Sequence, residues 1–167
     1  MALTIPQFHP ILIGIGDTTL AAHPETPERC AALSQRLRVA TGLNEVNLEA
    51  FLRAFYGAAR QDPLLGAALA RVADWEAHIA RLSQFWSSVV LMTGTYHGQP
   101  MQAHAHHGLG TAHFARWLAL FEEASAACRP PAGAAPLMER ARRIAASLEV
   151  GLIPLPLPQR TRQESPA

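Results

Sequence analysis

The chain has 167 residues, of which 49% are apolar and 16% charged, and its net charge is +1. This length suits a single domain with a real core, and without a basic stripe nothing in the sequence indicates nucleic-acid binding. The apolar run at 11–15 is far shorter than the roughly 20 residues of a membrane span. No basic stretch follows Met1, so we expect no signal peptide, no membrane partner and a cytoplasmic protein.

The two ends of the chain differ in composition from the middle. Residues 1–25 hold three prolines and two glycines without a lasting helical period, which predicts an N-terminal extension, either loosely docked or disordered. Residues 152–167 alternate proline with leucine and then become polar, which favours an extended polyproline tail. Such a tail fits a polyproline-binding groove, although no partner of that kind is implied. The middle, 26–151, is the predicted domain.

The first half of this domain reads as three helices. Thr26-Pro27 starts the first, because proline suits the first helical position, and Gly42 ends it. A second helix is predicted from about Asn47, with Tyr56 beside its apolar stripe. After a turn at 62–66, the strongest period predicts a helix over 69–92. Its apolar positions are Val72, Trp75, Ile79, Leu82, Phe85, Trp86 and Val89.

The second half continues without any segment that reads as a strand. A loop at 94–99 precedes a short helix from Pro100 to His107, which Gly108 and Gly110 break. Thr111 is predicted to cap a helix over 112–127, and a last helix over 136–149 follows a break at 129–133. The predicted fold class is all-α. The distant cysteines, Cys30 and Cys128, are expected to be reduced, buried thiols.

His104 lies one helical turn after Pro100, so this short segment is suited to holding one imidazole firmly. A neutral imidazole can bind a haem iron through one nitrogen. Two other interpretations of the residues remain open. One is a patch of solvated histidines, and the other is a non-haem Zn, Ni or Cu site. The first would comprise His104 with His106 and His107, and the second would use the histidine cluster of His97, His104, His106, His107 and His113.

Several motifs, taken in order, resemble those of the group III truncated haemoglobins. They cover roughly Pro27 to Gly151. The matching segments are Phe55-Tyr56, Asp62-Pro63-Leu64-Leu65-Gly66, Trp75-Glu76-Ala77-His78, Phe85-Trp86, Tyr96-His97-Gly98-Gln99-Pro100-Met101, His104, the run at 113–121 and the run at 142–148. The resemblance implies a truncated globin, a two-over-two helical sandwich around a b-type haem.

Carried over by position, the resemblance implies that His104 is the proximal iron ligand. Tyr56 falls on the distal tyrosine, His78 on the distal histidine and Trp117 on the tryptophan that lines the haem pocket. The full set of implied haem-pocket residues is Phe55, Tyr56, His78, Leu82, Phe85, His104 and Trp117. Further apolar residues are expected to form the core or the haem wall: Val72, Ile79, Val89, Phe114, Leu118 and Phe121. Arg71 and Arg116 are candidates for the propionates.

The family usually has an apolar residue after the proximal histidine and then a Leu-Pro step, where this chain has Ala105, His107 and Gly108. We therefore expect the short helix to be looser and wetter on its C-terminal side. The implied function is binding of dioxygen or another diatomic ligand at a five-coordinate iron, with Tyr56 as the main hydrogen-bond donor. The alternative is an enzyme that turns over peroxide or nitric oxide with an external reductase. Three hydrogen-bond donors to one ligand, from Tyr56, His78 and Trp117, are more than simple transport of dioxygen needs. The chain carries no flavin or nicotinamide motif.

Overall fold

The computed structural model of the protein describes residues 26–153, and in this range the chain is helical without strands. The elements are α1 (Pro27–Thr41), α2 (Glu45–Ala59), α3 (Pro63–Leu69), α4 (Trp75–Val90), α5 (Pro100–His104), α6 (Thr111–Ala126), the 3-10 helix η1 (Pro131–Gly133) and α7 (Ala134–Leu152). The all-α prediction is confirmed. The extension at 1–25 and the tail from 154 lie outside the described residues. Within 26–153, no helix has the length and apolarity needed to cross a bilayer.

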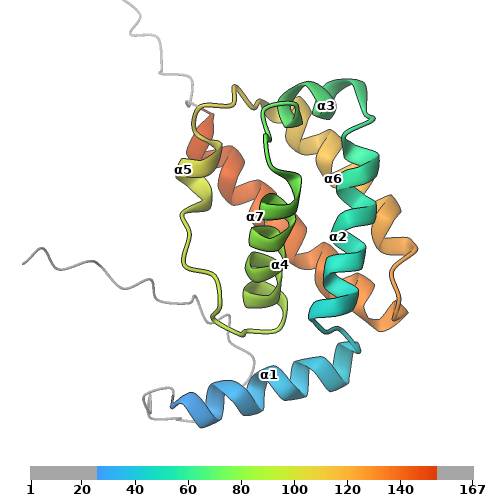
Figure 1. Ribbon diagram of the computed structural model, residues 1–167, viewed down its shortest axis with the longest axis vertical. Helices are drawn as coiled ribbons and strands as arrows, with labels where there is room; N and C mark the ends of the chain where they lie inside the picture. The colour runs from blue at the N-terminus through green and yellow to red at the C-terminus, as the bar shows by residue number, and fades with distance from the viewer. Residues whose placement is uncertain (1–25, 154–167) are drawn as a thin grey trace, which may run out of the picture.

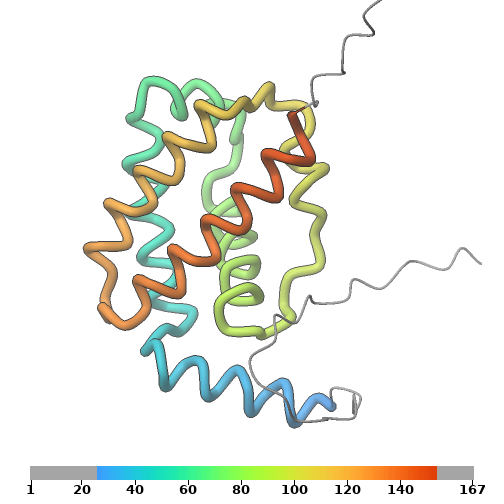
Figure 2. Tube along the Cα trace, turned by 180° about the vertical axis from the view of Figure 1, so that it is seen from behind, coloured from blue at the N-terminus to red at the C-terminus, as the bar shows by residue number. Residues whose placement is uncertain are grey.

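Two pairs of helices form the body of the molecule. Helices α2 and α4 lie side by side in one layer, and α6 and α7 cross behind them (Figure 1). Figure 2 shows the same layers from behind, with α6 and α7 nearest the viewer. Helix α1 lies across one end, and the segment 91–110 with α5 runs along one side. This is the expected two-over-two arrangement.

The core between the layers is apolar and aromatic. Phe121 of α6 stacks on Trp86 of α4 with ring centroids 5.0 Å apart, and Phe55 of α2 meets Phe121 edge-on at the same distance. Phe55, Trp86 and Phe121 are each at most 1% exposed. Burial of such side chains stabilises by about 1.5–3 kcal/mol each, so α2, α4 and α6 hold one another through this cluster.

The predicted helix over 69–92 is wrong at its start. The turn motif at 62–66 instead opens α3, because the Asp62 carboxylate accepts hydrogen bonds from the backbone N–H groups of Leu64 and Leu65. The chain then leaves the helix at Ala70, and Asp74 caps α4 by accepting from the Ala77 N–H. Val72, predicted on the apolar stripe, therefore lies in the turn between two helices and is half-buried.

Three other helix boundaries differ from the sequence prediction. Helix α5 ends at His104 rather than His107: Ala105 and His106 are exposed, and without packing a further helical turn is not held. Gly110, not Thr111, is the N-cap of α6, and its N–H donates to Nδ1 of His113 at 3.1 Å. Helix α7 runs over 134–152, longer than predicted at both ends.

Candidate haem site

Helix α4 carries two apolar stripes that meet different surroundings. Ile79, Trp86 and Val90 are at most 4% exposed and face the core. The second stripe follows the same helical spacing and is only half-buried: His78, Leu82, Phe85 and Val89. Phe85 contacts Tyr96 of the α4–α5 segment, with ring centroids 5.1 Å apart. This stripe therefore faces the α5 side, where an apolar surface is left incompletely covered.

His104 is the last residue of α5, on the side of the molecule that this second stripe faces. Its Nδ1 lies 2.6 Å from the carbonyl oxygen of Pro100. Because a carbonyl only accepts, Nδ1 must carry the proton, which leaves Nε2 with a free lone pair. The imidazole is half-buried. The pKa of His78 is lowered by burial first, then by the Arg81 charge and by the proximity of the His104 ring, so the two imidazoles are electrostatic neighbours.

Tyr56 lies on α2, in the other wall of the site. Its ring is 8% exposed and contacts His78 at 5.9 Å between centroids, and it meets Phe55 edge-on at 4.8 Å. Burial raises the pKa of Tyr56 to about 12, against an opposing hydrogen bond with Trp117. The indole N–H only donates, so the Tyr56 oxygen accepts from Trp117 and its own proton stays available to a third group.

Trp117 of α6 completes this group of rings. It contacts Phe55 edge-on at 5.4 Å and stacks on Phe121 at 4.9 Å between centroids. The structure thus brings Phe55, Tyr56, His78 and Trp117 into one cluster, which we call the distal cluster. Leu82 and Phe85 lie farther along α4, on the stripe of His78, while His104 comes from α5.

Sequence reasoning missed two residues beside the site. Trp75 contacts both Tyr56, at 6.2 Å, and His78, at 5.4 Å between ring centroids. Its position three residues before His78 on one helix was the available signal. Tyr96, which contacts Phe85, lies in a loop, and a loop position carries no periodic signal.

The two arginine candidates for the propionates have partners within the protein. Arg116 Nε donates to Asp62 at 2.7 Å, tying α6 to the cap of α3. The Leu65 N–H first, then Arg116 and the Leu64 N–H, hold the pKa of Asp62 below its usual range. Arg71 Nη1 donates a hydrogen bond to the carbonyl oxygen of His106 at 3.0 Å. Arg116 therefore serves the scaffold, while Arg71 links the turn before α4 to the segment after α5.

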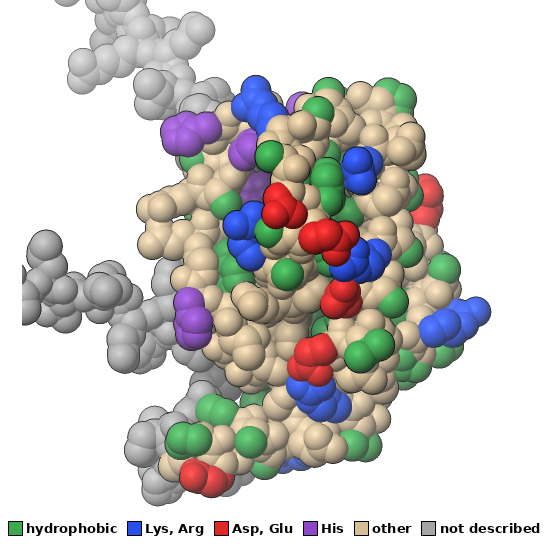
Figure 3. Space-filling model, in the orientation of Figure 1, with side chains coloured by type: hydrophobic (Ala, Val, Ile, Leu, Met, Phe, Trp, Pro, Cys, Tyr) green, Lys and Arg blue, Asp and Glu red, His purple; other side chains and the backbone are tan. Residues whose placement is uncertain are grey.

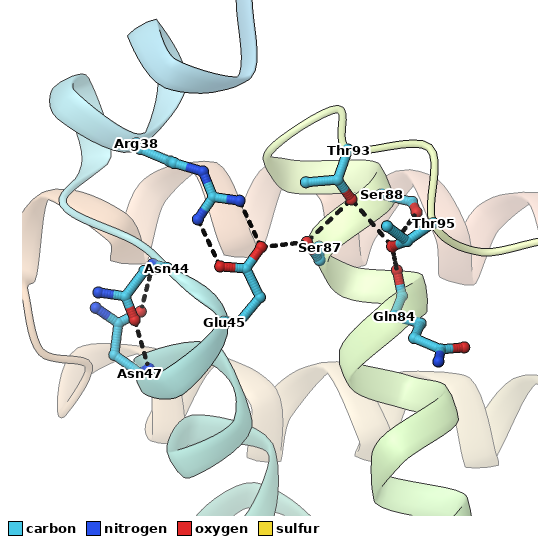
Figure 4. Close-up of polar contacts among 9 residues, drawn as sticks. All are labelled: Arg38, Asn44, Glu45, Asn47, Gln84, Ser87, Ser88, Thr93 and Thr95. Carbon is cyan, nitrogen blue, oxygen red and sulfur yellow. Dashed lines mark hydrogen bonds and ion pairs between the residues drawn. The ribbon is translucent and has the colours of Figure 1, made fainter. Parts of the chain in front are cut away.

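A chain of hydroxyl groups fixes the loop that leads to α5 (Figure 4). Ser87 of α4 donates to Glu45 at 3.2 Å and bonds Thr93 at 3.0 Å, and Thr93 bonds Thr95 at 3.1 Å. Thr95 reaches the Gln84 carbonyl at 3.4 Å and Ser88 at 3.3 Å. Glu45 also pairs with Arg38, whose guanidinium is the main cause that lowers the pKa of this carboxyl to about 2. We call these contacts the hydroxyl chain.

The histidine cluster does not form a metal site of its own. Histidine side chains gather over α5 on the face shown in Figure 3. Among residues 26–153, however, no three His, Cys, Asp or Glu side chains are arranged to hold a metal ion. The rings of His104 and His107 lie 6.5 Å apart, and Nδ1 of His113 is taken by the cap of α6.

Comparison with known proteins bears on the family and the fold of the chain. No protein-family model matches the sequence. A curated relative, group 3 truncated hemoglobin ctb of Campylobacter jejuni, is 30% identical over 87 residues, covering 48% of this chain and 68% of that protein. A crystal structure of group III truncated hemoglobin from Campylobacter jejuni has a TM-score of 0.61 at 26% identity, covering 66% of this chain and 92% of that one. The predicted fold is thereby confirmed.

Proposed function

Because the chain belongs to the group III truncated haemoglobins, we propose that it binds haem b between α4 and α5, with His104 as the proximal iron ligand and a diatomic ligand on the Tyr56 side. The globin domain is then 26–151. The observation that carries this proposal is the hydrogen bond from His104 Nδ1 to the Pro100 carbonyl. Histidines that ligate metals commonly donate their other ring N–H in this way, which fixes the tautomer and the ring orientation.

The surroundings of His104 fit a flat apolar group. The half-buried stripe of Leu82, Phe85 and Val89 offers one wall, and Tyr96 extends it. Such side chains limit the access of water and protons to the site. The haem iron, when bound, supplies one open coordination position for a diatomic ligand. Nε2 of His104, with its free lone pair, would hold that iron.

On the distal side, Tyr56 is the main hydrogen-bond donor. The Trp117 indole can only donate to the Tyr56 oxygen, which leaves the Tyr56 O–H to donate to the ligand. Its raised pKa keeps the proton in place at neutral pH. A hydrogen bond to a charged or strongly polarised acceptor contributes roughly 1.5–3 kcal/mol, which corresponds to release of the ligand about 10- to 100-fold more slowly.

A second candidate function is turnover of peroxide or nitric oxide with an external reductase. It is favoured by the gathering of His78 and Trp117 around Tyr56, since three polar groups beside one ligand exceed what reversible carriage needs. Peroxide-dependent turnover of the purified haem-loaded protein distinguishes the two. Fast ligand release without turnover would remove this second candidate.

The central experiment compares absorption spectra and dioxygen release of the parent with those of Tyr56→Phe. The chain has only one other tyrosine, so Tyr96→Phe is a matched control. We expect all three proteins to show the haem spectrum with and without carbon monoxide. Tyr56→Phe should release dioxygen about 10- to 100-fold faster, and Tyr96→Phe at the parental rate. A protein without a haem band would contradict the proposal, and unchanged release from Tyr56→Phe would contradict the donor role.

A further inference from the structure

Two adjoining cavities open on the outer side of α2, α3 and α4, away from α5. The larger, of about 320 Å³, is bounded by the α3 segment and the turn that follows it. The smaller, of about 110 Å³, lies between α2 and α4. Arg60 and Trp75 line both cavities. None of the roles argued above uses either of them.

The inner wall of the smaller cavity is formed by Tyr56 and Ile79. Both side chains are nearly buried, at 8% and 3% exposed. Tyr56 also contacts His78 and bonds Trp117. The Tyr56 side chain is therefore both a wall of this cavity and a member of the distal cluster. Only this side chain would separate a small molecule in the cavity from the proposed ligand position.

The dimensions suit a very small guest. The smaller cavity is open to solvent and partly lined by charged side chains, and its volume of about 110 Å³ far exceeds the roughly 10–15 Å³ that a water molecule needs, so a molecule of two atoms fits. Gly57 lies on the same wall of α2, and a side chain there would enter open space, because a Cβ built at this position meets nothing within 4 Å. A larger side chain can therefore be introduced at this exposed position beside the cavity without a clash.

The outer rim is polar and held by weak contacts. The Arg60 guanidinium lies over the Trp75 ring, 4.5 Å from its centroid, and cation–π contacts at exposed sites are weak. Arg53 bridges Glu49 of its own helix and Glu76 of α4, at 2.8 and 2.7 Å. Figure 3 shows acidic and basic side chains side by side over α2 and α4 on this face. Exposed pairs of this kind open readily.

We propose that the smaller cavity is a port through which the diatomic ligand enters and leaves the distal side, passing beside Tyr56 between α2 and α4. The Arg60–Trp75 stack is its cover. This inference rests on the proposed function, since it needs a ligand bound on the Tyr56 side.

The test is Gly57→Leu, which should fill the port, with Ala58→Leu on an exposed neighbouring position of α2 as the control. Carbon monoxide association is measured by flash photolysis of the haem-loaded protein and dissociation by ligand replacement. Blocking a route slows passage in both directions and leaves the equilibrium constant unchanged. We therefore expect both rates of Gly57→Leu to fall by the same factor, about 3-fold or more, and those of Ala58→Leu to match the parent.

Two results would overturn the port. One is unchanged rates in Gly57→Leu, and the other is a change in the equilibrium constant, which would mean that the substitution acts on the bound state. Trp75→Ala, which removes the cover, gives a second measurement: both rates should rise about 2-fold or more, and equal rates would count against the port. These outcomes are separate from the proposed function, which fails only if the parent binds no haem or if Tyr56→Phe releases dioxygen at the parental rate.

Discussion

The two sides of the haem site are built by different means. On the distal side, Phe55, Tyr56 and Trp117 come from two long helices and are held by stacked and edge-on rings in the core. On the proximal side, His104 ends a helix of five residues in which no residue is buried. Its polar support is the bond to a backbone carbonyl, the Arg71 bond to the segment after α5 and, farther back, the hydroxyl chain, while α5 contacts α7 without a buried residue. Packing positions the first side, and polar contacts position the second.

This difference predicts which substitutions will disturb each side of the site. Core packing is shared among many neighbours, so the distal cluster is preorganised whenever the fold is intact. A polar tether contributes only about 0.5–1.5 kcal/mol per bond, so the proximal side depends on a few named atoms. Substitutions on the two sides should therefore separate loss of haem from loss of the fold.

The largest effect is expected from His104→Ala. It removes the only proposed bond from protein to iron, so the haem should be lost or its spectrum changed. The helices should persist, because α5 contributes no buried residue. Absorption spectroscopy with circular dichroism measures both, and added imidazole should restore the spectrum. A variant with the parental spectrum and ligand binding would break the assignment of the proximal side.

A second substitution, Gly66→Ala, acts on the scaffold behind the distal side. A Cβ at Gly66 would lie 2.6 Å from the backbone oxygen of Arg60, so the end of α2 or the start of α3 must shift. We expect the free energy of unfolding to fall by about 1–3 kcal/mol, measured by denaturant unfolding. Gly57→Ala is the matched control: it meets no neighbour, and alanine in a helix should stabilise by about 0.5–1 kcal/mol.

Thr95→Val tests the polar support of the proximal loop. It deletes the hydroxyl that joins Thr93, Ser88 and the Gln84 carbonyl. Loss of one such bond should lower the free energy of unfolding by about 0.5–1.5 kcal/mol and speed haem loss roughly 2- to 10-fold. Transfer of haem to an excess of an acceptor protein gives the rate. Thr111→Val, at an exposed position of α6, should lose haem at the parental rate.

The smallest effect is a pH dependence that reports burial on the distal side. The pKa of Tyr56 is about 12 in the folded protein, because of burial, and about 10 in an unfolded chain. Between these values the unfolded state loses the proton first, so this group's contribution is intact below pH 10 and falls as the pH rises toward 12. By pH 11 the parent should lose about 1 kcal/mol of stability relative to Tyr56→Phe. Equal losses would mean that the hydroxyl is not buried.

Local signals in the sequence predicted what local chemistry decides. Proline at the first helical position marked the starts of α1 and α5, and the apolar period marked α4 from Trp75 onward. The same period misplaced the start of α4, because alternation of apolar residues continues through Val72 although Asp62 and Asp74 cap two separate helices. Capping competes with periodicity, and only the fold shows which one prevails.

For the same reason, only part of the candidate site could be predicted from the sequence. The position of His104 one turn after Pro100 is local, and it predicted a firmly held imidazole. The bond between its Nδ1 and the Pro100 carbonyl, the gathering of Trp75 with Tyr56, and the partners of Arg116 depend on how helices meet in space. Sequence spacing contains none of these distances.

The hydroxyl chain has a consequence for the boundary of the domain. Glu45 accepts from Arg38 of α1 and from Ser87 of α4, so the first helix braces the loop before α5 and His104 although it lies outside the two layers (Figure 1). A shortened protein starting at Asn44 would keep both helical layers yet leave that carboxylate with half of its partners. We therefore expect the smallest unit that holds haem in the proposed way to include α1 with Arg38.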